Sequence, residues 1–295
     1  MKPSKFLHRS AWGLVASCLT LALDLPLPAR SAEPQPPRSA EPQTPRSAEP
    51  MRLTVLSYNI HHAEGVDGKL DLDRIAKIIR DTKPDIVGLQ EVDARVARSK
   101  SVDQPNELAR LTGLPHVVFG KNIDLQGGGY GCAILSRFPI TTHENVPLPN
   151  VDQGEQRGVI RAELRIPGMD QPLIVLATHL DHRPDDRERV ASAKAINGLV
   201  ERTPDRPALL IGDMNAVIAS PTLKLLDAQW RRTNTQPLPT IPVSKPERQI
   251  DFVFVRPALS DQSQPQRWKL IDTQVLDEPV ASDHLPIVAV VELLP

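Results

Sequence analysis

The chain after residue 50 contains short apolar runs, each followed closely by a polar side chain. Four runs have the length and the Val, Ile and Leu content of buried β-strands. They span residues 53–57, 86–89, 173–177 and 208–211, and the polar side chains after them include Asn59, Glu91, His179 and Asp213. If these strands are neighbours with the same direction, their ends place the four side chains in one polar patch.

Helical patterns separate the strands. Asp71 stands where an N-cap is expected, before a helix whose apolar face carries Leu72, Ile75, Ile78 and Ile79. A second helix is expected to begin at residues 183–186 and to end near residue 202. Strands that alternate with helices predict an α/β fold.

Two later strands carry polar residues at their beginning. Asp251 precedes the apolar run 252–255, and Asp283 and His284 precede the last apolar run, 285–293. Polar residues at both ends of strands imply opposite strand directions, so we expect mixed or antiparallel sheets rather than a purely parallel one. A carboxylate among apolar neighbours needs a partner, and a histidine close in space would suit Asp251.

The predicted patch is rich in carboxylates. In an extended chain, Asp213 and Asn215 project from the same face, and Glu91 adds a further acid. Carboxylates without a counter-charge repel one another, and a divalent cation would remove that cost. Oxygen ligands of this kind favour Mg²⁺, Mn²⁺ or Ca²⁺ over zinc or copper.

The first 50 residues differ in composition from the rest. A basic start, the apolar run 11–23 and small residues at 29–32 are typical of a secretory signal peptide, which we assign to residues 1–32. We therefore expect a periplasmic or secreted protein with no transmembrane domain in its mature form. The tetrapeptide that ends at Cys18 also resembles a bacterial lipoprotein box, so a lipid anchor at Cys18 stays open.

Residues 33–51 continue an RSAEPQxP repeat that is rich in proline and charge. Such a segment cannot bury a core, so we interpret it as a linker to a domain over residues 52–295. The chain has a formal charge of −1 and 24% charged residues, a globular balance that excludes a disordered chain and a multi-span membrane protein. With Cys132 as its one cysteine, the domain depends on its core rather than on a disulfide, and we expect a monomer.

Seven short motifs, in this order, resemble those of the endonuclease/exonuclease/phosphatase family. They are Ser57-Tyr58-Asn59, Leu89-Gln90-Glu91, residues 131–137, Thr178-His179, Gly212-Asp213-Met214-Asn215, Ile250-Asp251 and Ser282-Asp283-His284. The resemblance covers essentially all of the chain after residue 50. It implies a four-layered α/β sandwich, in which two mixed β-sheets pack face to face with helices on the outer faces. It also implies metal-dependent hydrolysis of phosphate esters by an activated water.

The resemblance further implies roles for individual side chains. Glu91 would be the principal metal ligand, with Asn59 beside it to help hold the metal or phosphate, and Asp283 would be a further carboxylate of the metal site. Asp213 would orient and deprotonate the attacking water, and Asn215 would hold a phosphate oxygen.

Two histidines complete the site that the resemblance implies. His179 would donate a hydrogen bond to the phosphoryl group, and His284, paired with Asp251, would stabilise developing charge or act as an acid or base. A tyrosine and an arginine of the family also reach the site, which indicates Tyr130 and Arg157 here. The alternatives for these two residues are a packed loop aromatic and a surface ion pair.

Residues near the predicted site are interpreted as its edge. His61 and His62, with Glu64 and Asp67, suggest a second metal site, but loop residues after a strand more often shape the rim of a pocket. The proline-rich span 231–248 is expected to form a variable lid over the site.

The sequence carries less information on the substrate. Only eight aromatic residues follow residue 50, and lysines and arginines are scattered, whereas nucleases carry basic loops that track phosphates. We expect a phosphodiesterase or phosphomonoesterase that uses Mg²⁺, or else Mn²⁺ or Ca²⁺, and acts on a small or lipid-linked phosphate ester. A secreted nuclease on DNA or RNA is the alternative enzyme. A catalytically silent, tethered binding domain is the alternative from another class.

Overall fold

The computed structural model of the protein describes residues 50–257 and 267–294. The predicted signal peptide, Cys18 and nearly all of the predicted linker lie outside the described residues. The first strand begins at Met51, the last residue assigned to the linker. Among the described residues, no helix combines the length and the apolar character needed to cross a membrane.

The first sheet contains six strands from both ends of the domain. They are β1 (Met51–Asn59), β2 (Ile86–Ala94), β3 (His116–Leu125), β4 (Gly128–Ser136), β11 (Trp268–Val275) and β12 (Ile287–Leu293). Their order in the sheet is β11-β12-β1-β2-β4-β3. β1 runs parallel to β2 and antiparallel to β12, so this sheet is mixed, as predicted.

The second sheet contains the six strands between these groups. They are β5 (Ile140–Pro147), β6 (Gly158–Leu164), β7 (Leu173–His179), β8 (Ala208–Asp213), β9 (Arg231–Arg232) and β10 (Asp251–Val255). Their order is β5-β6-β7-β8-β10-β9. β7 and β8 are parallel, whereas β10 is antiparallel to β8.

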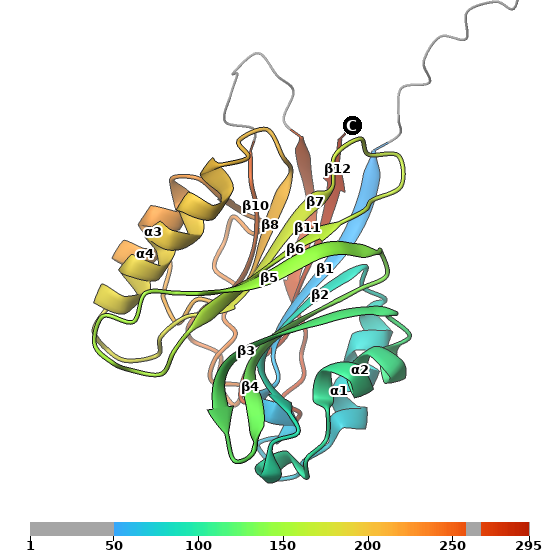
Figure 1. The fold of residues 1–295 in the computed structure, drawn as a ribbon, viewed down its shortest axis with the longest axis vertical. Helices are drawn as coiled ribbons and strands as arrows, with labels where there is room; N and C mark the ends of the chain where they lie inside the picture. The colour runs from blue at the N-terminus through green and yellow to red at the C-terminus, as the bar shows by residue number, and fades with distance from the viewer. Residues whose placement is uncertain (1–49, 258–266, 295) are drawn as a thin grey trace, which may run out of the picture. The chain divides into compact units, whose positions relative to one another are not determined.

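Helices cover the outer face of each sheet (Figure 1). α1 (Leu72–Thr82) and α2 (Gln104–Thr112) pack on the first sheet, and α3 (Arg187–Glu201) and α4 (Pro221–Asp227) pack on the second. Asp71 caps α1 as predicted, because its side chain accepts a hydrogen bond from the Arg74 amide at 2.9 Å. The second predicted helix begins at Arg187, just after the expected start.

The main core lies between the two sheets. Side chains such as Leu53 and Ile134 from the first sheet meet Val175 and Ile211 from the second, and all four are fully buried. A Cβ atom at Gly88 would lie only 2.6 Å from Ile211 Cγ2, so glycine permits this close approach of β2 to β8. The four-layered sandwich of two mixed sheets is therefore confirmed.

Candidate active site

The second sheet places three of the predicted site residues side by side. His179 is the last residue of β7, Asp213 is the last residue of β8, and Asp251 is the first residue of β10. The strand register pairs Asp213 with His179 on one side and with Asp251 on the other. Because β10 is antiparallel to β8, its first residue reaches the edge at which β7 and β8 end.

The first sheet adds Asn59 and Glu91. Asn59 ends β1, and Glu91 lies in β2 where the pairing with β4 shifts register between Leu89 and Val92. Glu91 has a φ of 56°, in the left-handed region, so this irregularity sets the direction of its side chain. Despite this irregularity, β2 continues to Ala94, whereas the sequence predicted a strand that ends at Leu89.

Asn59 connects the two sheets. Its Nδ2 donates to Glu91 Oε1 at 3.0 Å and to Asp213 Oδ2 at 3.1 Å. Its Oδ1 accepts a hydrogen bond from the His61 backbone amide at 3.1 Å. The amide nitrogen faces the carboxylates, so Asn59 positions these two acids. Its role in helping to hold the metal or phosphate stays a prediction.

Asp213 lies between two imidazole rings and is nearly fully buried. Its Oδ2 is 3.5 Å from His179 Nε2 and 3.8 Å from His284 Nε2. Its Oδ1 accepts a hydrogen bond from the Asn215 backbone amide at 2.8 Å. Burial and the neighbouring charge of Asp251 raise the pKa of Asp213 to about 7. A carboxylate with a pKa near neutral pH can both accept and release a proton there.

His284 is paired with Asp251, as predicted. Nδ1 of His284 lies 2.9 Å from Asp251 Oδ2, and the Thr240 hydroxyl donates to the same oxygen at 2.6 Å. Although burial disfavours the charged ring, the carboxylates of Asp251 and Asp213 raise the pKa of His284 to about 10. We call Asp213, Asp251 and His284 the Asp213 cluster; it offers one ligand atom per residue within a mutual 4.8 Å.

Arg157 fixes the tautomer of His179. A guanidinium only donates hydrogen bonds, and Arg157 Nη1 lies 3.2 Å from His179 Nδ1, so the ring proton is on Nε2. That Nε2–H faces Asp213. Burial, Arg157 and the neighbouring histidines hold the pKa of His179 well below its usual value, which keeps the ring neutral. Arg157 also contacts His182 Nδ1 at 3.2 Å and Glu155 at 3.0 Å.

A cavity of about 310 Å³ lies at this site. The lining residues are Glu91, Tyr130, Glu155, Arg157, His179, His182, Asp213, Asn215, Asp283 and His284. Four of them are carboxylic acids, and one is a guanidinium. This donor set, with its excess of acids, fits an oxygen-ligated divalent cation. Asp213 belongs to the Asp213 cluster and Glu155 pairs with Arg157, which leaves Glu91 and Asp283 as the acids available to the cation.

Asn215 reaches the cavity by a route that differs from the prediction. The chain leaves the extended conformation after Asp213, and Asn215 has a φ of 47°. Its side-chain nitrogen donates to the Leu180 carbonyl at 3.0 Å. The bend, and not strand alternation, therefore places Asn215 beside Asp213.

A protein-family model matches most of this chain. The model of the Endonuclease/Exonuclease/phosphatase family covers residues 56–284, a span that contains every residue of the cavity. The chain belongs to the endonuclease/exonuclease/phosphatase family. Members of this family are hydrolases of phosphate esters, and many depend on a metal ion.

Relatives in sequence and structure agree with this membership. Protein YbhP of Escherichia coli K12 is 29% identical over 252 residues, which cover 81% of this chain and 96% of YbhP. A family structure from Beutenbergia cavernae is 27% identical with a TM-score of 0.71, over 82% of this chain and 72% of that one. A mannosyl-6-phosphatase from Bacteroides thetaiotaomicron, 19% identical, shares the fold with a TM-score of 0.65, over 81% of this chain and 99% of that one.

The span 231–248 does not form the predicted lid over this family site. None of its residues is among those that line the cavity. The Thr240 hydroxyl instead donates to Asp251, which is fully buried. The Thr240 backbone carbonyl accepts from the Leu285 amide at 2.9 Å. The proline-rich composition indicated irregular backbone correctly but gave no information on which side of the site it packs.

Two contributors to the family site, Thr240 and Glu155, were not singled out from the sequence, and a third, Ser282, appeared there as part of a motif without a role of its own. Thr240 and Ser282 position other residues: the Ser282 hydroxyl donates to the Asn59 carbonyl at 2.8 Å, and Thr240 holds Asp251. Glu155 lines the cavity beside Arg157. Glu155 precedes the arginine by two residues, which is the one sequence signal that pointed to it.

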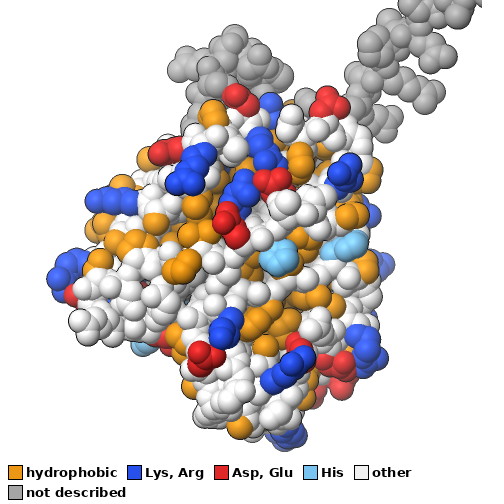
Figure 2. Space-filling model, viewed as in Figure 1, with side chains coloured by type: hydrophobic (Ala, Val, Ile, Leu, Met, Phe, Trp, Pro, Cys, Tyr) orange, Lys and Arg blue, Asp and Glu red, His pale blue; other side chains and the backbone are white. Residues whose placement is uncertain are grey.

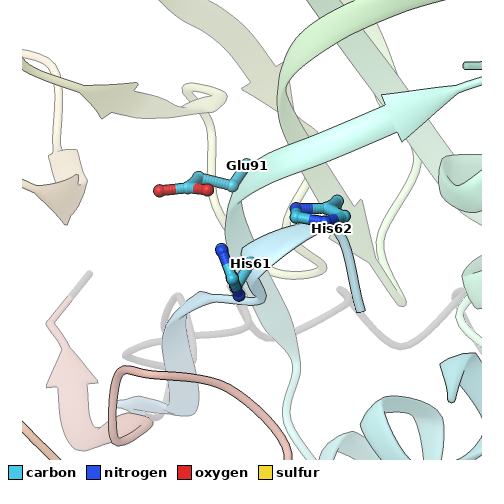
Figure 3. Close-up of side chains that lie close together, drawn as sticks. All are labelled: His61, His62 and Glu91. Carbon is cyan, nitrogen blue, oxygen red and sulfur yellow. The ribbon is translucent and has the colours of Figure 1, made fainter. Parts of the chain in front are cut away.

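His61 and His62 do not line the cavity, but they lie next to Glu91, which does. Both belong to η1 (His61–Ala63), the turn that follows β1, and with Glu91 they offer one ligand atom each within a mutual 4.8 Å (Figure 3). We call these three residues the His61 cluster. Asp67 does not join them, because it forms an ion pair with Arg74 at 3.1 Å.

Proposed function

We propose that the protein is a divalent-metal-dependent phosphodiesterase or phosphomonoesterase that acts outside the cytoplasm, as a monomer, on a small or lipid-linked phosphate ester. The observation that carries the proposal is the position of Asp213. It lies between His179 Nε2 at 3.5 Å and His284 Nε2 at 3.8 Å, beside a cavity lined by acids. Such a carboxylate is suited to take a proton from a water that attacks phosphorus.

Glu91 and Asp283 are the residues proposed to hold the cation. When bound, a divalent ion polarises the phosphoryl oxygens and lowers the pKa of a coordinated water. Asn59 holds Glu91 and Asp213 at a fixed separation, because one amide nitrogen donates to both carboxylates. Asp213 then accepts the proton of the attacking water at a pH near its pKa of about 7.

Neutral donors are proposed to stabilise the phosphoryl group. His179 presents Nε2–H, since Arg157 occupies its Nδ1, and Asn215 keeps a second N–H beyond the one donated to Leu180. Donors held in fixed directions stabilise charge on the phosphoryl oxygens without reorganisation. His284 is charged at neutral pH, because its pKa is about 10, and can stabilise or protonate the leaving oxygen.

The surface supports a small or lipid-linked substrate more than a nucleic acid. Among the residues that line the cavity, Arg157 is the only lysine or arginine. On the face drawn in Figure 2, basic and acidic side chains are interspersed instead of forming a basic stripe. A protein that tracks a nucleic-acid backbone needs several phosphate contacts from lysine and arginine. The relative named mannosyl-6-phosphatase adds support for a small phosphate ester as substrate.

A substrate panel tests the proposal. The purified chain is incubated with a phosphomonoester, a phosphodiester, a phospholipid, plasmid DNA and RNA, each with Mg²⁺, Mn²⁺, Ca²⁺ or EDTA. We expect turnover of at least one of the three esters, loss of that turnover in EDTA, and recovery when Mg²⁺ or Mn²⁺ is restored. Asp213→Asn serves as the inactive control.

Other results of the panel would replace the proposal. Salt-sensitive cleavage of DNA or RNA without ester turnover would establish the nuclease alternative. No turnover of any substrate, in a folded protein that still binds a phosphate ester, would establish the silent binding domain. Fractionation of the source cells tests the location, with recovery from the cytoplasm alone as the contrary result.

A further inference from the structure

We propose that His61, His62 and Glu91 form a binding site for a first-row transition-metal ion, separate from the oxygen-ligated cation of the phosphoesterase. One ligand atom from each residue lies within 4.8 Å of the other two. Figure 3 shows a ring nitrogen of His61 directed toward the Glu91 carboxylate, and His62 beside it. A histidine binds a metal ion through an unprotonated ring nitrogen, which carries a lone pair.

His61 has its lone pair on Nε2. Its Nδ1 lies 3.0 Å from the backbone carbonyl oxygen of Glu64. A carbonyl oxygen only accepts hydrogen bonds, so Nδ1 carries the hydrogen. In a neutral imidazole, Nε2 is then the unprotonated nitrogen, and it is free to bind a metal.

His62 has its lone pair on Nδ1. Its Nε2 lies 3.4 Å from the carboxylate of Glu64, which accepts, so Nε2 carries the hydrogen. The remaining nitrogen, Nδ1, is buried and has no hydrogen-bond partner among the described residues, and the whole residue is only 7% exposed. A buried nitrogen without a partner is costly, and a metal ion would remove that cost.

Glu64 thus contacts both histidines from the side away from the proposed ion. Metal-binding histidines commonly donate their second ring N–H to a carboxylate or a backbone carbonyl, which fixes the ring and its tautomer. Glu64 supplies the carbonyl to His61 and the carboxylate to His62. It is a positioning residue in this proposal rather than a ligand.

The backbone around the cluster is held in an unfavourable conformation. His61 and His62 each have a φ of 43°, Ala63 has a φ of 65°, and Glu91 has a φ of 56°. Residues with a Cβ rarely adopt this left-handed region, and such conformations concentrate at functional sites. All three proposed ligands share this feature.

The ligand set selects the class of ion. Two imidazoles and one carboxylate suit Zn²⁺, Fe²⁺ or Co²⁺, whereas Mg²⁺ and Ca²⁺ prefer oxygen ligands. Glu91 Oε1 accepts a hydrogen bond from Asn59, which leaves Oε2, the second oxygen of the carboxylate, as a further ligand atom. Glu91 can therefore belong both to this site and to the oxygen-ligated site next to it.

Metal binding by the full chain, prepared without a polyhistidine tag, tests the proposal. Co²⁺ is titrated in the presence of excess Mg²⁺, and its visible absorption bands and affinity are recorded; Zn²⁺ content is measured after dialysis. We expect about one bound transition ion per chain, and a His61→Gln/His62→Gln double variant is expected to bind at least tenfold more weakly. The control, His143→Gln, changes an exposed histidine of β5 and is expected to bind like the wild type.

A second variant guards against loss of folding. Glu64→Gln leaves the ligands in place and is expected to weaken Co²⁺ binding roughly tenfold, because His62 loses its carboxylate partner. Unchanged affinity in both the double variant and Glu64→Gln would overturn the proposal, as would binding that is lost only in His284→Gln. Because binding is measured without substrate, this result is independent of the phosphoesterase activity.

Discussion

The Asp213 cluster and the His61 cluster are adjacent, and Asn59 links one acid of each. Each offers one ligand atom per residue within a mutual 4.8 Å. In the Asp213 cluster three of the four carboxylate oxygens accept hydrogen bonds: Asp251 Oδ2 accepts from His284 and Thr240, and both oxygens of Asp213 accept from Asn59 and Asn215. The fourth, Asp251 Oδ1, is buried and has no partner among the described residues. In the His61 cluster, hydrogen bonds to Glu64 occupy one nitrogen of each ring and leave the other with its lone pair.

This difference shows that proximity alone does not define a metal site. A cluster in which a charged imidazole is hydrogen-bonded to one acid and lies 3.8 Å from another is organised to move protons and to stabilise charge. A cluster whose rings are held from behind, with lone pairs left over, is organised to bind an ion. Variants in each cluster should therefore affect different observables.

Replacement of Asp213 should have the largest effect. Asp213→Asn keeps the size of the side chain but removes the proton acceptor, so we expect kcat to fall by about 10³-fold. Steady-state hydrolysis of the best ester from the panel measures this. Asp170→Asn, an exposed acid, is the control and should retain wild-type kcat. Turnover of Asp213→Asn within threefold of wild type would contradict the role of the Asp213 cluster.

Replacement of Arg157 should have the next largest effect. Arg157→Gln removes the donor that fixes His179 and the charge that lowers its pKa, so kcat/KM should fall by about 10²-fold. The acidic limb of the pH profile should move to higher pH, because His179 becomes easier to protonate. Arg161→Gln removes an ion pair to Glu163 on the same strand and is the matched control. A loss of stability with an unmoved pH profile would assign Arg157 a structural role only.

Removal of the Thr240 hydroxyl should have a smaller effect on turnover. Thr240→Val takes one of two hydrogen bonds from Asp251 Oδ2, and we expect kcat to fall roughly tenfold with little change in KM. Thr233→Val is the control, since that buried hydroxyl donates to the Val253 carbonyl at 3.1 Å and not to Asp251. Equal kcat values for the two variants would show that Thr240 does not position the catalytic pair.

The pH dependence of stability should show the smallest effect. The pKa of Asp213 is about 7 in the folded protein against an ordinary value of 3.8, so the native state keeps a proton that the unfolded chain releases. Stability of the metal-free protein should therefore fall as pH rises from about 4 toward 7. The raised pKa of His284 adds stability that is complete below its ordinary value of 6.5 and is lost as pH rises toward about 10.

Melting temperatures in EDTA between pH 4 and pH 5.5 isolate the contribution of Asp213, because His284 stays largely protonated in both states. Across this range, Asp213→Asn should gain on the order of 5 °C relative to wild type. Parallel curves for the two proteins would show that burial of this carboxylate does not raise its pKa.

The sequence was sufficient for those parts of the site that depend on single strands. The apolar runs before His179 and Asp213 locate the ends of β7 and β8, and the run after Asp251 locates the start of β10. Because a strand end is a local property, three residues far apart in the chain could be assigned to one edge. The opposite directions of these strands also predicted the mixed sheets.

Features that depend on long-range contacts could not be predicted in this way. The direction of the Glu91 side chain depends on a register shift against β4, and Asn215 leaves the strand in a left-handed bend. Thr240 reaches Asp251 from a span that composition alone suggested was a lid. The lone pair on His62 depends on its contact with Glu64, which no spacing rule encodes.

A crystal structure with Mn²⁺ and inorganic phosphate tests the central claim most directly. We predict an anomalous scattering peak within coordination distance of the Glu91 carboxylate, with phosphate oxygens in contact with His179 Nε2 and the Asn215 amide. An ion and a phosphate that bind elsewhere on the surface, with this cavity filled by water alone, would contradict the account.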